Sequence, residues 1–380
     1  MATTADEAFR AAAATATNYA TNYGVWIMWW VIVILLVSWI INKGRLAGKE
    51  GSNCTTMNTV YKEFPPISTV NTSASGYKFG LRDYYIKTAY NCCSAGYYKN
   101  DFVNICALNN CIRSGARCLD FAVYSVDNRP VIAVSSMEDY STKESYNSVP
   151  FGEAMEAIAN NAFASGATTC AGDPLLIHLR ILSNNKKIYT EMTKDIYNSL
   201  QPYILGKEYS YQNHNKNLGA TNLNELKGKV IIMVDKSNPL FIETPLDEYV
   251  NIASGTPYMW IKKYHDVKYT HNMEELITHN KQYMTICLPD VTTDTKNPSM
   301  LLCNDMGVQL VGMSFQNFDS NMEAASLFFN SAGSAFSLKP ERLRYIPDTV
   351  AAPSTQDPKL SFAARQSTGL TRTAAGEWSF

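Results

Sequence analysis

The sequence has no surplus of charge of either sign. Its 380 residues carry 33 Lys and Arg against 34 Asp and Glu, which gives a formal net charge of -1. A protein that binds nucleic acid uses a basic surplus to contact phosphate groups, and this chain has none. We therefore predict no nucleic-acid partner.

Histidine is scarce, and no common metal-binding or phosphate-binding motif is present. Three of the 5 histidines, His265, His271 and His279, are spaced unlike any common metal-ligand pattern. The 9 cysteines are odd in number and include the adjacent pair Cys92 and Cys93, but no Cys-x-x-Cys motif. These features favour reduced, buried thiols over a disulfide framework. We predict no metal and no cofactor.

What the sequence does have is one long apolar run near its start. Residues 25–41 (VWIMWWVIVILLVSWII) contain no charge, and their number is near the lower limit of about 17–25 for a spanning helix. The run lacks the polar stripe of a soluble core helix and the flanking residues of a cleaved signal peptide, so we predict a transmembrane helix over 25–42. Tryptophans lie near both ends, as interfacial anchors do: Trp26, Trp29, Trp30 and Trp39.

The charges beside this run predict its orientation. Lys43, Arg45 and Lys49 directly follow it, whereas the residues before it carry little positive charge. Positive charges stay on the cytosolic side, so we expect a single-pass protein whose large C-terminal part faces the cytosol. An internal membrane wrapped into a virus particle has such a face as well.

Composition divides the rest of the chain into further parts. Residues 1–24 are rich in Ala and Thr and form a short tail that extends the anchor helix. Residues 43–78 are rich in Ser, Thr, Asn and Gly and predict a linker, and residues 348–380 predict an extended tail. Such a tail buries too little apolar surface to order itself, so we expect neighbouring proteins of a larger assembly to hold it.

The central region, residues 79–347, alternates short apolar runs with helical patterns. The expected strands are 120–125, 131–134, 174–182 and 230–234, and the expected helices include 151–163 and 188–200. This alternation predicts parallel βαβ units. Periodicity alone leaves a closed barrel and a doubly wound sheet as alternatives.

Four segments carry distinctive motifs: DYYIKTAYNCC (83–93), ARCLDFAVYS (116–125), RPVIAVSSM (129–137) and DPLLIHLRIL (173–182). Together they resemble the X region of the phosphoinositide-specific phospholipase C family. The resemblance implies that Tyr90 and Val134 occupy the positions of the two catalytic histidines. Tyrosine titrates near pH ~10 and valine not at all, so neither can transfer protons at neutral pH.

The same resemblance implies that the family's calcium site is degenerate. Its positions correspond here to Asn91, Asp120, Ala122 and Arg180, of which only Asp120 is a carboxylate. On an alternating strand His178 and Arg180 share one face, which the resemblance directs toward the former site together with Asp120. We predict an ion pair between Asp120 and Arg180 that replaces the cation. The alternative is that Arg180 reaches solvent at the barrel mouth.

The second half of the central region resembles the same family. LKGKVIIMVDK (226–236) is similar to the strand whose lysines contact substrate phosphates, but those two positions read Met233 and Asp235. Residues 297–317 and 330–344 resemble the family's Y region. The resemblance implies an α/β fold, a distorted TIM-like (β/α)8 barrel of the phospholipase C type, preceded here by a single transmembrane helix.

Loss of the acid/base and metal groups implies a pseudoenzyme, because each positioned acid or base contributes about 10²–10⁴-fold to the rate. We therefore predict a catalytically inactive, membrane-anchored structural or docking protein of a large assembly, such as a minor capsid protein of a large DNA virus with an internal membrane. Two alternatives remain open. One is a phosphoinositide-binding module without turnover, and the other is an atypical active phosphodiesterase with Tyr90 as substitute nucleophile.

Overall fold

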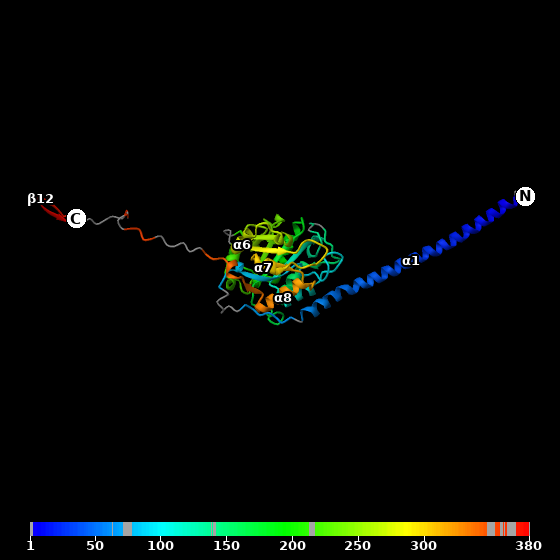
Figure 1. Cartoon of the computed structure of the whole chain (residues 1–380), viewed down its shortest axis with the longest axis horizontal. Helices are drawn as coiled ribbons and strands as arrows, with labels where there is room; N and C mark the ends of the chain where they lie inside the picture. The colour runs from blue at the N-terminus through cyan, green and yellow to red at the C-terminus, as the bar shows by residue number, and fades with distance from the viewer. Residues whose placement is uncertain are drawn as a thin grey trace. The chain divides into compact units, whose positions relative to one another are not determined.

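The computed structural model describes residues 3–62, 64–70, 78–137, 139, 142–212, 217–347, 354–357, 360, 362 and 370–379. The chain divides into two compact units, Met1–Tyr345 and Ile346–Phe380. The larger unit holds the barrel and the long N-terminal helix, drawn in Figure 1.

Eight parallel strands form a nearly closed barrel in the order β7-β6-β5-β2-β1-β10-β9-β8. Neighbours in this order are joined by parallel ladders. The fold class predicted from the resemblance, an α/β barrel, is confirmed. In chain order the strands are β1 (Tyr84–Ala89), β2 (Cys118–Val126), β5 (Leu175–Ile181), β6 (Val230–Asp235), β7 (Ile252–Ser254), β8 (Met259–Lys263), β9 (Met284–Leu288) and β10 (Leu310–Met313).

The barrel is incomplete between β7 and β8. These strands follow each other directly in the chain, and an isolated antiparallel bridge between Thr256 and Met259 lies where a ladder would close the barrel. A parallel ladder needs a long crossover connection, which the few residues between the two strands do not supply. This gap in the barrel wall therefore lies away from β1, β2 and β5.

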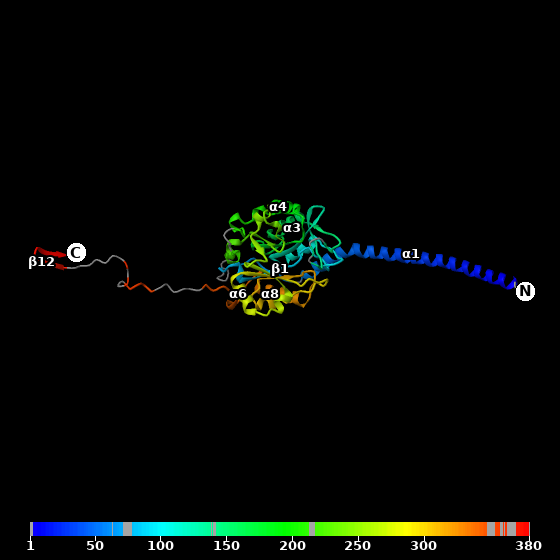
Figure 2. The ribbon, with the colours of Figure 1, turned by 90° about the horizontal axis from the view of Figure 1, so that it is seen from above.

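Helices surround the barrel, with α3 and α4 on one side and α6 and α8 on the other (Figure 2). Their apolar faces cover the strands, of which β1 and β5 are buried along their whole length, and this gives one continuous core. The helices after the N-terminal one are α2 (Ile105–Arg113), α3 (Phe151–Ala162), α4 (Lys187–Leu200), α5 (Tyr264–Lys268), α6 (Met273–Gln282), α7 (Met300–Asp305) and α8 (Ser320–Ala332). Short 3-10 helices cover Leu81–Asp83, Gln201–Tyr203, Lys207–Tyr209, Leu218–Ala220, Leu223–Leu226, Pro239–Phe241, Asp247–Tyr249 and Glu341–Leu343.

Among the described residues, three further strands of this sheet lie outside the parallel path. β3 (Arg129–Ile132) pairs antiparallel with β2, β4 (Val149–Pro150) pairs antiparallel with β3, and β11 (Phe336–Leu338) pairs antiparallel with β1. The expectation of a parallel unit is therefore wrong for residues 131–134. Asp127 and Asn128 both have positive φ (51° and 61°), which is the two-residue hairpin turn that reverses the chain between β2 and β3.

The N-terminal helix α1 (Thr3–Tyr61) is much longer than the predicted span. By length and composition it can cross a membrane, and it is the one such helix in the part of the chain that the structure describes. The predicted linker over 43–78 is wrong for residues 43–61, which are helical. Met57 is buried, and the Tyr61 hydroxyl donates to the Phe315 carbonyl at 2.7 Å. This tertiary packing stabilises a helix over a segment of low intrinsic propensity.

The remainder of the predicted linker is partly described. Residues 64–70 run along the barrel, where Ser68 forms a bridge with Ser334. Residue 63 and residues 71–77 lie outside the described residues.

A disulfide joins α1 to the barrel, which corrects the expectation that all cysteines are reduced thiols. Cys54 and Cys106 are bonded, with their Cα atoms 6.0 Å apart, and the other seven cysteines are free and buried. Folding brings together two residues 52 positions apart in the sequence, which cysteine spacing alone did not indicate.

The smaller unit contains a hairpin within the predicted extended tail. β12 (Leu370–Thr373) pairs antiparallel with β13 (Gly376–Ser379). The expectation of an extended tail is wrong for residues 370–379. Gly376 has φ 141°, a conformation that glycine adopts without steric cost directly after the turn.

Candidate functional site

A buried polar cluster occupies the carboxyl end of the barrel, where active sites of TIM barrels lie. Asp120 on β2 is the ladder partner of His178 on β5, and Arg180 lies two residues further along the same strand. Because alternate residues of a strand share one face, His178 and Arg180 both point toward Asp120. Tyr90 and Asn91 follow β1 directly, so three adjacent strands supply the cluster.

Arg180 and Asp120 form an ion pair with several hydrogen bonds. Arg180 Nη2 donates to Asp120 Oδ2 at 2.8 Å, and Nε donates to both carboxylate oxygens at 3.0 and 3.2 Å. Nη2 also donates to Asn91 Oδ1 at 2.6 Å. Asp120 has no exposed surface and Arg180 is only 4% exposed. The guanidinium thus lies in the cluster and not in solvent at the barrel mouth.

A second row of hydrogen bonds crosses the barrel from Asp120 to Ser254. His178 Nδ1 lies 2.7 Å from Asp120 Oδ1, and His178 Nε2 lies 2.9 Å from Ser254 Oγ. Serine hydrolases hold the same three residue types in this order. Here all three side chains are fully buried, and the Ser254 hydroxyl donates to the Val234 carbonyl at 3.2 Å. The row is therefore packed into the barrel and presents no nucleophile to a substrate.

The charges of this cluster keep Asp120 ionised. Burial by itself disfavours a carboxylate, but the positive charge of Arg180 and the hydrogen bonds from His178 and Arg180 outweigh it. The pKa of Asp120 consequently lies below its usual range. An ionised carboxylate that already accepts these hydrogen bonds has little remaining capacity for another cation.

Aromatic side chains close the cluster. The Arg180 guanidinium carbon lies 4.7 Å from the centre of the Tyr90 ring, which packs edge-on against Tyr98 at 5.8 Å. The Tyr98 hydroxyl in turn hydrogen-bonds Ser314 at 2.5 Å. The cavity that remains, lined in part by Ala122, has a volume of ≈ 10 Å³. A single water molecule needs about that much space, so the site has no room for a lipid headgroup.

The other positions from the resemblance do not join the cluster. Val134 is buried after β3, and its carbonyl accepts from the amides of Glu144 and Ser145. Met233 is fully buried on β6, beside His178 in the ladder. Asp235 accepts a hydrogen bond from the Ser237 amide, so its carboxylate stabilises the loop that follows β6.

The described residues contain no group of three or more His, Cys, Asp or Glu side chains that could hold a metal ion. His279 stacks on Trp260 at 3.6 Å, and its Nε2 lies 3.1 Å from the Met284 carbonyl. Burial lowers the pKa of His279 to about 4. His279 is therefore a packed, neutral ring at neutral pH.

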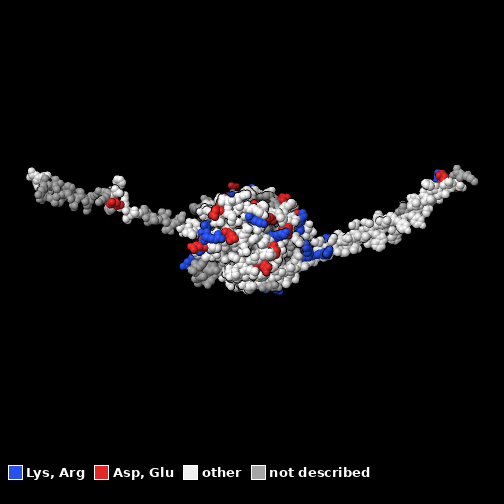
Figure 3. All heavy atoms as spheres, in the orientation of Figure 1, with Lys and Arg blue, Asp and Glu red and all other residues white. Residues whose placement is uncertain are grey.

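The apolar window of the predicted membrane anchor is not buried inside the protein. The side chains of Trp26, Trp29, Trp30 and Trp39 are all exposed along α1. The Lys43 ammonium lies 5.9 Å from the Trp39 ring, a cation–π contact at the end of the apolar run. Figure 3 shows α1 as largely uncharged, with Lys and Arg gathered where it reaches the barrel; Lys43, Arg45 and Lys49 lie in this stretch.

Sequence reasoning placed Asp120, Arg180 and Asn91 at one site, and the structure brings them together. It missed Ser254 and gave His178 no role. The alternation of β5 already placed His178 on the inward face, which is a usable signal. No signal in the sequence links Ser254, on the distant strand β7, to His178.

Comparison with known proteins agrees with this architecture. Residues 256–342 match the model of the phosphatidylinositol-specific phospholipase C Y domain. PLC21 of L. pealei is similar over 74% of this chain with a TM-score of 0.60 and 18% identity, and PLC21 of S. officinalis over 70% with a TM-score of 0.53 and 17% identity. The chain covers 40% and 38% of those proteins. A search of curated proteins found no match.

The matched segment begins after Tyr90, Asp120, Val134 and Arg180, so their correspondence to family site residues rests on the motif resemblance. The structural similarity, at this level of identity, concerns the fold. The Y-domain match and the barrel together give this chain a domain like the catalytic domain of phosphatidylinositol-specific phospholipase C.

Proposed function

We propose that this protein is a membrane-anchored, phospholipase C-like pseudoenzyme that serves as a structural or docking component of a larger assembly. One observation carries the proposal. The Arg180–Asp120 ion pair and the Tyr90 ring fill the carboxyl end of the barrel and leave ≈ 10 Å³ of space. A substrate headgroup could enter only if these buried side chains moved apart.

The chemistry of the side chains supports the same proposal. General acid/base transfer at neutral pH needs a group such as imidazole, and the one imidazole in the cluster, His178, is held by Asp120 and Ser254. The guanidinium of Arg180 supplies a fixed positive charge beside Asp120, so a divalent cation would meet repulsion there.

The anchor supports a role at a membrane. Residues 25–42 of α1 would contact the bilayer, and the positive charges after them favour the barrel on the cytosolic face. The barrel would then join a bilayer to neighbouring proteins, which also hold the tails. A virion with an internal membrane is an assembly of this kind, so the proposal includes a role as a minor capsid protein of such a virion.

Hydrolysis by the full chain tests the proposal. The protein is reconstituted in nanodiscs that contain phosphatidylinositol and its bisphosphate, with calcium and then with chelator, beside an active phospholipase C. We expect no product above the empty-nanodisc background. Calcium-dependent turnover that is lost in Tyr90→Phe would show an active phosphodiesterase and overturn the proposal.

Calorimetry with soluble inositol trisphosphate separates the binding alternative from the structural one. A closed site predicts no heat of binding with the wild-type chain. Saturable binding that Arg180→Met abolishes would mean that the barrel retains headgroup affinity without turnover. The exposed Arg113 on α2 provides the matched control, Arg113→Met.

A further inference from the structure

The cysteines of this chain are divided by their exposure. Seven are buried and free, whereas Cys54 and Cys106 are partly exposed and bonded to each other. The two thiols that solvent reaches are thus the two that pair. A buried thiol is protected from oxidants, while an accessible pair can exchange with them.

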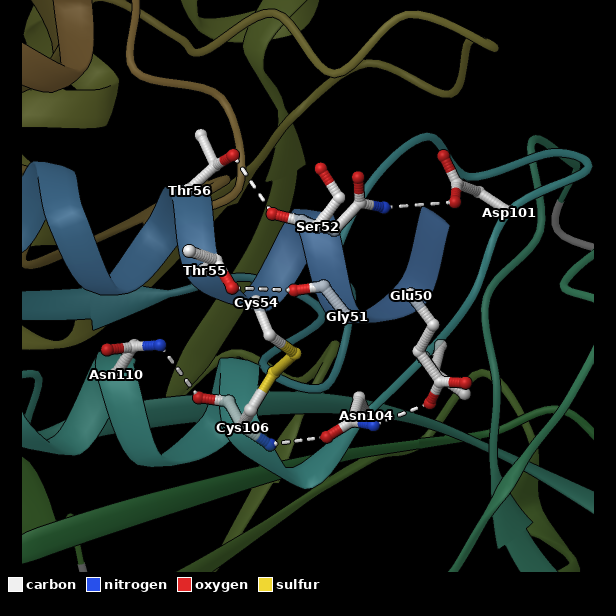
Figure 4. The surroundings of a disulfide bond; sticks show 12 residues. Glu50, Gly51, Ser52, Cys54, Thr55, Thr56, Asp101, Asn104, Cys106 and Asn110 are labelled. Atoms are coloured by element: carbon white, nitrogen blue, oxygen red, sulfur yellow. Dashed lines mark hydrogen bonds between the residues drawn. A yellow bond between two sulfur atoms is a disulfide. The ribbon is translucent and has the colours of Figure 1, made fainter. Parts of the chain in front are cut away.

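The disulfide lies where the membrane helix meets the barrel (Figure 4), between α1 and the start of α2. Three polar contacts flank it. Lys49 Nζ lies 2.7 Å from Asp101 Oδ2, and Asn53 Nδ2 donates to Asp101 Oδ1 at 3.1 Å. Glu50 accepts from Asn104 Nδ2 at 2.5 Å. The Lys49 side chain is 35% exposed, whereas its partner Asp101 is only 1% exposed and the hydrogen bonds of Asn53 and Glu50 are partly buried, so these contacts act together with the disulfide.

Packing holds the last turns of α1 independently of the disulfide. Met57 is 3% exposed, and Tyr61 donates a hydrogen bond to the Phe315 carbonyl. The Tyr61 ring also packs tilted against the Phe315 ring and edge-on against the Phe318 ring. Residues 57–61 therefore stay on the barrel when the disulfide is absent. Residues 46–54 have only the partly buried polar contacts of Lys49, Glu50 and Asn53 in its place.

Cys106 is positioned for thiol–disulfide exchange. It is the second residue of α2, and its amide donates to Asn104 Oδ1 at 2.8 Å. The amide dipoles at the start of a helix favour a thiolate in the first turn. Thiolate is the form that attacks a disulfide.

We propose that Cys54–Cys106 is a reversible redox clamp that fixes or frees the membrane-proximal turns of α1 on the barrel. Closure consumes a small disulfide such as oxidised glutathione: the Cys106 thiolate attacks it and releases one glutathione thiolate, then the Cys54 thiolate attacks the Cys106 sulfur and releases the second. Two protein thiols become one disulfide, and one glutathione disulfide becomes two thiols.

The clamp sets how firmly the barrel is oriented to the bilayer. Six residues, 43–48, separate the predicted span from Lys49, which is on the order of 10 Å of helix at about 1.5 Å per residue. With the clamp closed, the helix direction at the barrel surface is fixed. In a reducing cytosol the clamp is open, and it closes when the protein meets an oxidising environment.

Hydrogen exchange of the full chain in nanodiscs tests the clamp under oxidised and reduced glutathione. Reduction is expected to speed amide exchange in residues 46–54 by about 30-fold, which corresponds to about 2 kcal/mol, the lower end for a disulfide. Residues 57–61 and helix α8 should keep their protection. Cys54→Ser and Cys106→Ser should each exchange like the reduced wild type in both buffers.

Two results would overturn the clamp. One is peptide mapping that finds Cys54 and Cys106 as free thiols after equilibration with oxidised glutathione. The other is a mapped disulfide whose reduction leaves exchange in residues 46–54 unchanged, because the bond would then not control α1. Neither result depends on whether the barrel hydrolyses lipid.

Discussion

Replacing Arg180 by methionine removes the cation that neutralises Asp120. Methionine keeps an unbranched apolar stem of similar length, so the loss concerns the guanidinium and its hydrogen bonds more than the packing. The carboxylate of Asp120 then remains fully buried with His178 as its main partner, 2.7 Å away. We expect Arg180→Met to destabilise the barrel strongly while leaving its fold intact.

The magnitude follows from the geometry of the pair. Arg180 makes hydrogen bonds of 2.8, 3.0 and 3.2 Å to Asp120 and one of 2.6 Å to Asn91, and both charged side chains are buried. Removing one partner of a buried pair costs about 3–5 kcal/mol. Because His178 still contacts the Asp120 carboxylate, we expect a loss of stability at the lower end of this range, about 3 kcal/mol. At about 2–4 °C per kcal/mol, the melting temperature should fall by about 6–12 °C.

Denaturation of the detergent-solubilised full chain measures this loss, with circular dichroism following the barrel transition. The matched control is Arg113→Met, since Arg113 is exposed on α2, and its melting temperature should stay within about 1–2 °C of wild type. The double variant Asp120→Asn/Arg180→Met removes both charges and keeps a polar group near His178. It should recover more than half of the loss, because no unpaired charge stays buried.

A loss of less than about 1 kcal/mol in Arg180→Met would refute the argument that the pair is desolvated and structural. A double variant as unstable as the single one would also contradict it. In that case the loss would come from packing of the Arg180 stem and not from the charge left on Asp120.

Three further predictions concern Asp120, Lys87 and Tyr61. Wild-type stability should fall as the pH drops below about 4, because the pKa of Asp120 is lower in the folded than in the unfolded chain and the stability that Asp120 contributes is lost as its carboxylate protonates. Acid titration followed by fluorescence should show a shallower loss of stability in Arg180→Met. Burial lowers the pKa of Lys87 to about 8. Between pH 8 and 10.5 only the unfolded chain keeps the Lys87 proton, so the free energy of unfolding should rise by about 3 kcal/mol over this range. Urea titrations of Lys87→Met should not show this rise. Tyr61→Phe loses one hydrogen bond to Phe315 and should cost about 1 kcal/mol by chemical denaturation, with an unchanged result meaning that the α1 end is not anchored there.

The barrel and part of its site could be predicted from short-range sequence features. Strand alternation placed His178 and Arg180 on one face of β5, and the motif resemblance put Asp120 opposite them. The contact between Asp120 and Arg180 was expected because an acid and a base lie on neighbouring strands, but only the structure excluded the alternative that Arg180 reaches solvent.

The row through Ser254 could not be predicted in the same way. Ser254 lies on β7, two strands away from β5 in the sheet order, and reaches His178 only because the sheet curls into a barrel. The local sequence around a serine at the end of a short strand does not predict its hydrogen-bond partner. The same holds for β3, whose apolar run resembled a parallel strand until the Asp127–Asn128 turn reversed it.

The sequence by itself determined the apolar helix near the start and the alternating strands, because each depends on periodicity within a few turns or residues. The choice of a barrel over a doubly wound sheet came from the motif resemblance. Only the tertiary structure decided that residues 43–61 are helical, that Cys54 pairs with Cys106, and that Arg180 points into the barrel. These three outcomes depend on contacts between segments far apart in the chain. A segment of weak helix propensity folds as a helix when Met57 is buried and Tyr61 is partly buried against the barrel. Two cysteines bond when packing holds their Cα atoms 6.0 Å apart.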